Sequence, residues 1–219
     1  MIFGCESLSE PFNLIRAFHN AFRRDVAQID DSILNIARSS GDLPASLDRL
    51  HIMGEILDYH ARAEELAVFP AVDHVAPLVA TAYILDHREL DTMVNGLEAV
   101  QKTFDPYTTA RATAVLKSHL MIHLRKEDVH LYPILKEQTT ESERASIVSQ
   151  MAKPVPPEKY PMVVQWLFPL LDLENQVAMT KVWMTLMPPQ VFDNLKLLIK
   201  KAIPENWGKL TQQIPELDK

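Results

Sequence analysis

The sequence predicts an all-α protein: an up-down-up-down four-helix bundle with an additional C-terminal helical segment. Apolar residues recur with helical spacing through four long segments before residue 138, and the 219-residue chain contains only 5 glycines. A pattern of the form H-x3-E-x4-[FY]-P also occurs twice, at residues 60–70 and 123–133. Because residues four apart lie on one face of a helix, each copy predicts a helix that presents a His and a Glu together.

The first pair of helices is expected before residue 73. The first helix should begin at Ser9, a favourable N-cap, with Pro11 in its first turn, and it should carry His19 on its apolar stripe. The Ser-Ser-Gly-Asp segment at residues 39–42 ends this helix. The second helix is expected from about residue 44 to residue 72, and it carries the first copy of the repeated pattern.

The second pair of helices repeats this order. A helix should follow Pro77 and carry His87 until Asp105-Pro106 breaks it. The last helix of the bundle, from about residue 108 to residue 137, carries the second copy of the pattern. Each half therefore offers one His and then one H-x3-E, which predicts two helical hairpins related by a pseudo-two-fold axis with metal ions between them.

The sequence changes character at residue 138, so we predict a bundle over residues 9–137 and a C-terminal extension over residues 138–219. Residues 140–143, Thr-Glu-Ser-Glu, form a capping-box signature that should open a short helix through Met151. Beyond a proline-rich link, further helices are expected around residues 162–171, 172–186 and 191–203. All 8 histidines precede residue 131, so the candidate chemistry belongs to the bundle.

Composition narrows the function classes. A net charge of -7 disfavours nucleic-acid binding. The single cysteine, Cys5, excludes an intramolecular disulfide and fits a reducing cytosol. The first residues lack the basic start and apolar run of a signal peptide, and the most apolar stretch, residues 162–171, is far shorter than the roughly 20 residues of a membrane span. We therefore expect a cytoplasmic protein with no nucleic-acid or membrane partner.

Six residues on the predicted apolar stripes are candidate metal ligands: His19, His60, Glu64, His87, His123 and Glu127. Buried carboxylates are costly unless they are paired or bound to metal, although arginines or the histidines themselves are an alternative set of partners. Imidazoles and carboxylates without thiolates suit iron, manganese or zinc. If both glutamates and an oxide or hydroxide bridge two ions, about two coordination positions stay open for another ligand.

Three more residues are candidates for an extra ligand or for support of the ligands: His119, Asp91 and Tyr83. His119 lies one turn before His123 and is the best candidate for a fifth imidazole. Asp91 should hydrogen-bond an imidazole rather than bind metal, and Tyr83 should either join the aromatic core or reach a bound oxygen species. His51 and His74 are expected at the surface. The aromatic-proline pairs that close both copies of the pattern should shape helix ends.

The pattern as a whole resembles the hemerythrin-like, or HHE cation-binding, family over about residues 9–137. The resemblance rests on His19, His60-x3-Glu64, His87 and His123-x3-Glu127. It implies a four-helix bundle with a non-haem diiron site whose ligands stand at these positions. Two features depart from classical hemerythrin, because Asp91 replaces a second His and an H-x3-E replaces an H-x4-D. The chain is more similar to repair-of-iron-centres proteins and to the hemerythrin modules of BRUTUS-type ubiquitin ligases, which the extension also resembles at residues 143–148 and 166–169.

We therefore expect a protein with two iron ions that binds dioxygen or a related small oxidant for sensing, storage or scavenging. The missing His opens the site further, which also fits a diiron oxidoreductase acting on peroxide or nitric oxide, or iron–sulfur cluster repair by iron delivery. A third alternative is a regulatory module in which iron or oxygen changes contacts of the extension. The sequence assigns no catalytic residue, leaves enzyme status open, and accepts manganese or zinc.

The role of the apolar residues in the extension can be interpreted in two ways. Met162, Trp166, Trp183 and Met187 could form a surface for a protein partner or for a homodimer. We expect instead that they pack against the bundle, because an apolar helix must bury its stripe.

Overall fold

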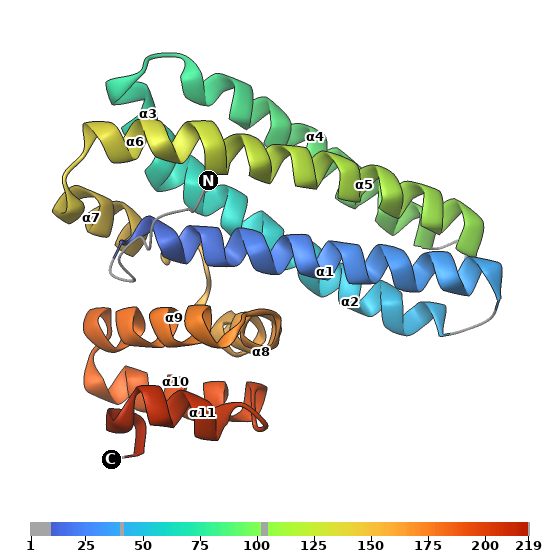
Figure 1. Cartoon of the computed structure of the whole chain (residues 1–219). Helices are drawn as coiled ribbons and strands as arrows, with labels where there is room; N and C mark the ends of the chain where they lie inside the picture. The colour runs from blue at the N-terminus through green and yellow to red at the C-terminus, as the bar shows by residue number, and fades with distance from the viewer. Residues whose placement is uncertain (1–9, 40–41, 102–104, 219) are drawn as a thin grey trace, which may run out of the picture.

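The computed structural model describes residues 10–39, 42–101 and 105–218. Within these residues there are helices and no strands, and the chain forms the expected four-helix bundle with further helices after it (Figure 1). Two of the four bundle helices run straight and two continue through a short π-helical turn. In chain order the bundle consists of α1 (Phe12–Arg38), α2 (Leu43–Ala63), a π turn (Glu64–Val68), α3 (Phe69–Val75), α4 (Val79–Gln101), α5 (Pro106–Lys126), a second π turn (Glu127–Leu131) and α6 (Tyr132–Gln138).

Side-chain caps fix where two of the bundle helices begin. The Asp42 carboxylate accepts a hydrogen bond from the backbone of Ala45, and Asp105 accepts from the backbone N–H groups of two residues in the first turn of α5. A proline follows each cap within the first turn, where its missing N–H costs nothing. Pro11 occupies the N-cap position of α1 without a side-chain cap. The predicted capping role of Ser9 lies outside the described residues.

The two π turns are the main local departure from the sequence prediction. In each, a backbone N–H reaches back five residues, from Phe69 to the carbonyl of Glu64 and from Tyr132 to that of Glu127. The next residue in each case is a proline, which cannot donate and whose ring would clash with the carbonyl four residues earlier in an α-helix. The wider turn removes this conflict. The aromatic-proline pairs therefore mark the starts of α3 and α6, each within a continuous helical rod rather than at its far end.

A polar layer divides the apolar interior of the bundle into two clusters. The larger cluster includes Phe22, Met53 and Leu120 and also takes in side chains of the C-terminal helices. The smaller cluster, around Val68 and Leu135, lies toward α3 and α6. The two π turns begin between these clusters, so the repeated His and Glu residues stand where the apolar packing is interrupted.

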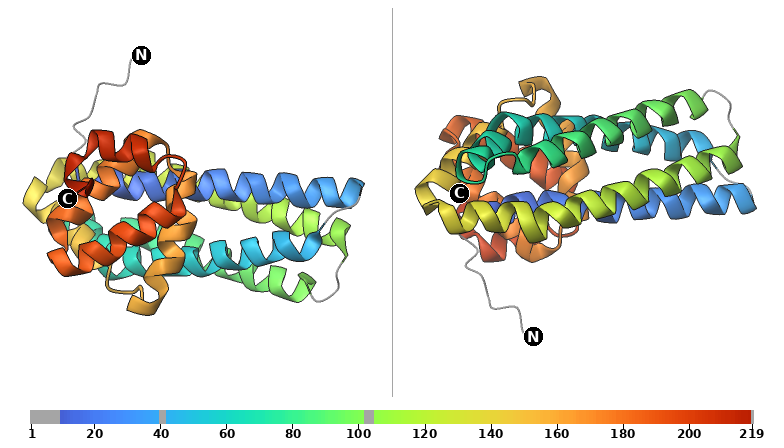
Figure 2. Two further views of the ribbon diagram at one scale, coloured as in Figure 1. Left: turned by 90° about the horizontal axis from the view of Figure 1, so that it is seen from below. Right: turned by 90° about the horizontal axis from the view of Figure 1, so that it is seen from above.

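The C-terminal helices gather at one end of the bundle, the end at which α3 and α6 lie (Figure 2). The predicted capping box is present, since Thr140 and Glu143 exchange hydrogen bonds at the start of α7. One helix, α11, was not expected from the sequence, which predicts only the four before it. The helices are α7 (Glu141–Met151), α8 (Tyr160–Leu170), α9 (Leu173–Leu186), α10 (Pro189–Ala202) and α11 (Trp207–Gln213).

A buried polar contact joins α8 to the first hairpin of the bundle. The Trp166 indole N–H donates to Asp25 Oδ2 at 2.6 Å, and Arg49 Nε donates to Asp25 Oδ1 at 2.6 Å. Asp25 is fully buried, so these donors are needed to offset the cost of removing its charge from water. At the rim, Lys159 pairs with Glu55 at 2.6 Å. None of the helices in the described ranges is both long enough and apolar enough to cross a membrane.

Candidate metal site

The structure brings together all six side chains that the sequence proposes as metal ligands. Each comes from a bundle helix or a π turn and is at most 8% exposed. The side chains are His19 on α1, His60 on α2, Glu64 on the first π turn, His87 on α4, His123 on α5 and Glu127 on the second π turn. The spacing of the repeated pattern therefore does place His and Glu on one inward face in both hairpins.

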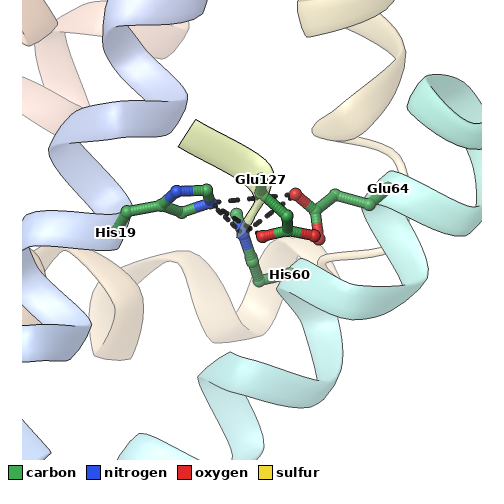
Figure 3. Close-up of side chains that lie close together, drawn as sticks. All are labelled: His19, His60, Glu64 and Glu127. Carbon is green, nitrogen blue, oxygen red and sulfur yellow. Dashed lines mark hydrogen bonds and ion pairs between the residues drawn. The ribbon is translucent and has the colours of Figure 1, made fainter. Parts of the chain in front are cut away.

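These side chains form two overlapping groups that could each hold a metal ion. One group contains His19 and His60, the other His87 and His123, and both groups share Glu64 and Glu127. Within each group, one nitrogen or oxygen atom of every residue lies within 4.8 Å of the others. Figure 3 shows the first group, in which the two imidazoles and the two carboxylates point toward one another from three different helical rods.

Each carboxylate presents one oxygen atom to each pair of histidines. Glu64 Oε1 is 3.4 Å from His60 Nε2, and Glu64 Oε2 is 3.4 Å from His87 Nε2. Glu127 Oε2 is 3.5 Å from His19 Nε2, and Glu127 Oε1 is 3.3 Å from His123 Nε2. Two ligand atoms that each lie about 2.0–2.2 Å from one first-row metal ion are separated by about this much. Each of the two groups thus offers donors at a spacing that could hold a metal ion.

Three carboxylate oxygens at the centre lack a hydrogen-bond partner. Among the described residues, Glu64 Oε2 and both oxygens of Glu127 are buried and accept no hydrogen bond. Leaving such an atom unsatisfied costs about 1–3 kcal/mol per group, and more when the group is charged. In the described part of the chain neither carboxylate pairs with an arginine or a lysine, so the histidines are the basic side chains that face them. A bound cation fits the donor set.

The two glutamates cannot both carry a charge cheaply without a cation. Burial raises the pKa of Glu127 well above its ordinary value, and the nearby negative charge of Glu64 raises it further. Burial also acts to raise the pKa of Glu64, but the adjacent His60 and hydrogen bonds from histidines outweigh it and hold that pKa well below the ordinary value. A metal ion between the carboxylates would allow both to be ionised.

Two histidines are supported from behind by carboxylates of the opposite hairpin. His19 Nδ1 is 2.8 Å from Asp128 Oδ1, and His87 Nδ1 is 3.1 Å from Glu65 Oε1. Burial alone would lower the pKa of each imidazole, but these carboxylates and Glu64 outweigh it and raise both pKa values. The contacts leave Nε2 of each ring directed to the centre, as a metal ligand requires.

The third supported imidazole is His123, whose Nδ1 lies 3.3 Å from Asp86 Oδ2. Here burial dominates and lowers the pKa of His123 to about 4. Every supporting carboxylate is in turn paired with a cation on its outer side. These ion pairs are Asp128 with Arg23, Glu65 with Arg88, and Asp86 with Lys126.

These three supporting carboxylates are not among the site residues that the sequence predicts, although the chain carries a signal for them. Glu65 directly follows Glu64, Asp128 directly follows Glu127, and Asp86 directly precedes a site histidine. The side chain of an acidic residue next to a buried ligand points in a different direction around the same helix. It can therefore contact an imidazole on a neighbouring helix. The signal was an acidic residue adjacent to a candidate ligand, not one turn away from it.

His60 differs from the other three histidines. Among the described residues no carboxylate contacts its Nδ1 atom, and its Nε2 lies 3.1 Å from His19 Nε2. Its ring packs between Phe18 and Phe22, with ring centroids 6.1 Å and 5.4 Å away. His60 therefore has an apolar outer environment where the others have an ion pair.

Tyr132 belongs to the site as well, which corrects the prediction that it only shapes a helix end. Its hydroxyl donates a hydrogen bond to Glu64 Oε1, and its ring lies 5.8 Å from that of His19. Burial raises the pKa of Tyr132 well above its ordinary value, and the charge of Glu64 adds to this effect. The hydroxyl thus keeps its proton beside the carboxylate.

None of the three weaker candidates lies at the centre of the site, although Tyr83 does join the aromatic core, as one of its two alternatives expects. His119 is exposed, and its Nδ1 lies 3.0 Å from the carbonyl of Val115 in its own helix, because the helix turns it away from the centre. Asp91 is a partly exposed residue near Arg88, and Glu65 takes the role expected of it. Tyr83 is buried, but its hydroxyl lies 3.2 Å from His130 Nδ1 rather than at the centre. His51 and His74 are exposed, as expected.

Comparison with known proteins agrees with this geometry. The family model of the hemerythrin HHE cation binding domain matches residues 10–135. A BRUTUS-like zinc finger protein of Arabidopsis thaliana is 24% identical over 212 residues, covering 92% of this chain and 17% of that protein. The zinc finger protein BRUTUS of the same plant is 24% identical over 176 residues, covering 77% of this chain and 14% of that protein. This chain therefore spans less than a fifth of the length of these relatives. No solved structure matches it.

Proposed function

The chain belongs to the hemerythrin HHE cation-binding domain family, and we propose that it holds two iron ions and binds dioxygen or a related small oxidant. The proposed ligands are His19, His60, Glu64, His87, His123 and Glu127. The role is sensing, storage or scavenging of that oxidant in the cytoplasm. Bound iron would supply redox chemistry and open coordination positions, which manganese or zinc could occupy without the same reactivity toward oxygen.

One observation carries this proposal: the buried carboxylate oxygens of Glu64 and Glu127 that accept no hydrogen bond from the described residues. Buried charges of this kind are normally paired or bound to metal. Each carboxylate also faces imidazoles of both hairpins, so each can bridge two ions. Four imidazoles and two bridging carboxylates leave coordination positions for a small exogenous ligand.

The chain's own side chains perform three tasks in this proposal. Asp128, Glu65 and Asp86 orient three imidazoles so that Nε2 faces the centre. Tyr132 holds a proton beside Glu64, where it can donate to a ligand or stabilise the carboxylate. The two apolar clusters on either side exclude water from the centre.

An optical experiment tests the proposal. A ferrous sample prepared without oxygen should gain charge-transfer absorption on exposure to air, and Glu127→Gln should abolish this change because it removes one bridging charge. Glu137→Gln is a matched control, since Glu137 is exposed on α6. Protein that stays spectroscopically silent with iron bound would contradict oxidant binding. Steady-state consumption of peroxide or nitric oxide would favour the enzyme alternative.

A regulatory role is the second candidate, because the C-terminal helices contact the first hairpin close to the site. Phe22 packs against both His60 and Trp166, with ring centroids 5.4 Å and 4.8 Å apart. A change at His60 could therefore reach α8 through one side chain. Limited proteolysis of residues 138–219 should then differ between iron-loaded and metal-free protein, and equal rates would count against this role.

A further inference from the structure

An apolar cavity that is partly open to solvent lies between the bundle and the C-terminal helices. Its volume is about 140 Å³. The bundle contributes residues of α1 and α2, and the extension contributes residues of α7, α8, α9 and α10. The walls include Phe18, Ile56, Val148, Val163, Met179 and Trp183. Neither the bundle nor the extension encloses the cavity alone, so it exists only where the two are packed together.

The polar side chains around this cavity are few, and they have partners within the protein. The Tyr59 hydroxyl donates to Glu55 at 2.8 Å, and the Tyr160 hydroxyl donates to the carbonyl of Ala152 at 3.3 Å. His60 also lines the cavity, and its Nε2 lies 3.1 Å from His19 Nε2 and 3.4 Å from Glu64 Oε1. A water molecule needs two to four polar partners to occupy a buried site, and these walls offer few.

We propose that this cavity is a binding site for one uncharged, apolar small molecule about the size of a single aromatic ring. The proposal rests on the size of the cavity, its apolar walls and its position next to His60. An apolar cavity of about 150 Å³ in another protein remains dry and binds benzene or xenon, so the volume here is sufficient. A charged ligand is disfavoured, because the walls include no charged side chain that could serve as its counter-ion.

The site is separate from the proposed metal-binding function but touches it at one residue. Of the six candidate ligands, His60 is the one that lines the cavity. A molecule in the cavity would contact His60, whose ring also packs against Phe18 and Phe22. Binding should therefore occur in metal-free protein and should also alter the environment of His60.

Benzene is the probe for this site, with thermal unfolding and saturation-transfer NMR as the measurements. Benzene near its solubility limit should raise the Tm of the metal-free full-length protein and give a saturation-transfer signal. Val148→Phe should abolish both effects, because Val148 lines the cavity and a phenyl ring would fill it. Val182→Phe is the matched control: it makes the same change at another half-buried valine in the extension, one that does not line the cavity, and it should bind benzene within about twofold of wild type.

Three results would overturn the proposal: no binding of benzene to wild type, equal binding to Val148→Phe, or equal stabilisation by benzoate. If Val148→Phe does not unfold cooperatively, Val155→Phe fills the cavity from the link after α7 and serves the same purpose. In the folded protein, benzene should also shift the imidazole resonances of His60 and leave those of His123 in place. Loss of metal binding does not affect these outcomes, so they are independent of the proposed diiron function.

Discussion

The two hairpins of the bundle carry the same sequence pattern but place its residues in different surroundings. In the second hairpin, both histidines have a carboxylate behind them, and these carboxylates are paired with Arg88 and Lys126. In the first hairpin, His19 has such a partner but His60 faces phenylalanine rings and an apolar cavity. The repeated pattern thus explains where each candidate ligand lies. It does not explain which side chains contact the outer side of each histidine.

The difference extends to the two bridging glutamates. Glu64 accepts a hydrogen bond from Tyr132, whereas neither oxygen of Glu127 accepts one from the described residues. The two hairpins thus supply the same types of ligand, but the residues that contact these ligands differ. The two halves of the site are therefore unequal. Packing of the C-terminal helices against the first hairpin accounts for part of this asymmetry, since α8 lies beside α1 and α2, and α9 lies beside α1 (Figure 1).

The largest expected effect comes from removing the carboxylate that has no hydrogen bond. Glu127→Gln should lower metal affinity by more than the roughly 10- to 100-fold typical of supporting residues, because it removes a bridging charge from both halves. Metal content after dialysis measures this effect. The variant should remain folded by circular dichroism, since glutamine has the same shape. Full metal content in Glu127→Gln, with Glu137→Gln as control, would show that Glu127 does not bind metal.

The supporting carboxylates should have the next largest effect. Asp128→Asn, Glu65→Gln and Asp86→Asn should each lower metal affinity by about 10- to 100-fold, because each holds one imidazole in place. Asp91→Asn should leave the affinity unchanged, since Asp91 is a partly exposed residue paired with Arg88. Competition with a chelator measures the four affinities. Equal effects in all four variants would mean that these contacts do not orient ligands.

Lowering the pH should protonate some of the candidate histidine ligands before others, because their pKa values differ. Carboxylates raise the pKa of His19 and His87, so protons compete with metal at these rings as the pH falls through values above 6.5. His123, whose pKa is about 4, should not contribute in this range. Metal affinity should therefore fall between pH 8 and pH 6, by at most about tenfold per unit for each protonated imidazole. A chelator titration at several pH values measures this, and a flat profile would contradict it.

The smallest effect on the metal site is expected from the contact that docks the extension. Trp166→Phe removes one of the donors to buried Asp25 and should lower the free energy of unfolding by about 1–3 kcal/mol. Trp207→Phe is the control, because Trp207 lies on α11 away from this contact. Chemical denaturation compares the two. Metal affinity should change little in either variant, whereas a large loss in Trp166→Phe would indicate that the extension supports His60 directly.

Helical periodicity was sufficient to predict the bundle and the six inward side chains, because burial of an apolar stripe dictates which residues face the centre. It failed for His119, which precedes a site histidine by one turn. Four residues turn a helix by roughly 400°, so each such step shifts the side chain by about 40°. Leu116 and Leu120 are fully buried there, which leaves His119 exposed. A residue one turn from a buried ligand is therefore expected to be buried only if the apolar stripe of the helix is wide enough to include it.

Contacts between helices were the other part that the sequence alone did not provide. Glu65, Asp86 and Asp128 reach histidines on other helices, so their roles depend on helix rotation and register. The π turns depend on a local conflict that is visible in the sequence, a proline at the same position in both copies of the pattern. That signal could have predicted a local change of helix geometry, although not which one.

Metal analysis of the protein purified from iron-supplied cells tests the central claim most directly. Two bridging carboxylates with two imidazoles on each side predict close to two iron ions per chain. The ions should be lost together in Glu127→Gln, since both halves share that carboxylate. Protein that is free of metal, or that holds a single ion unaffected by this substitution, would contradict the shared dinuclear site.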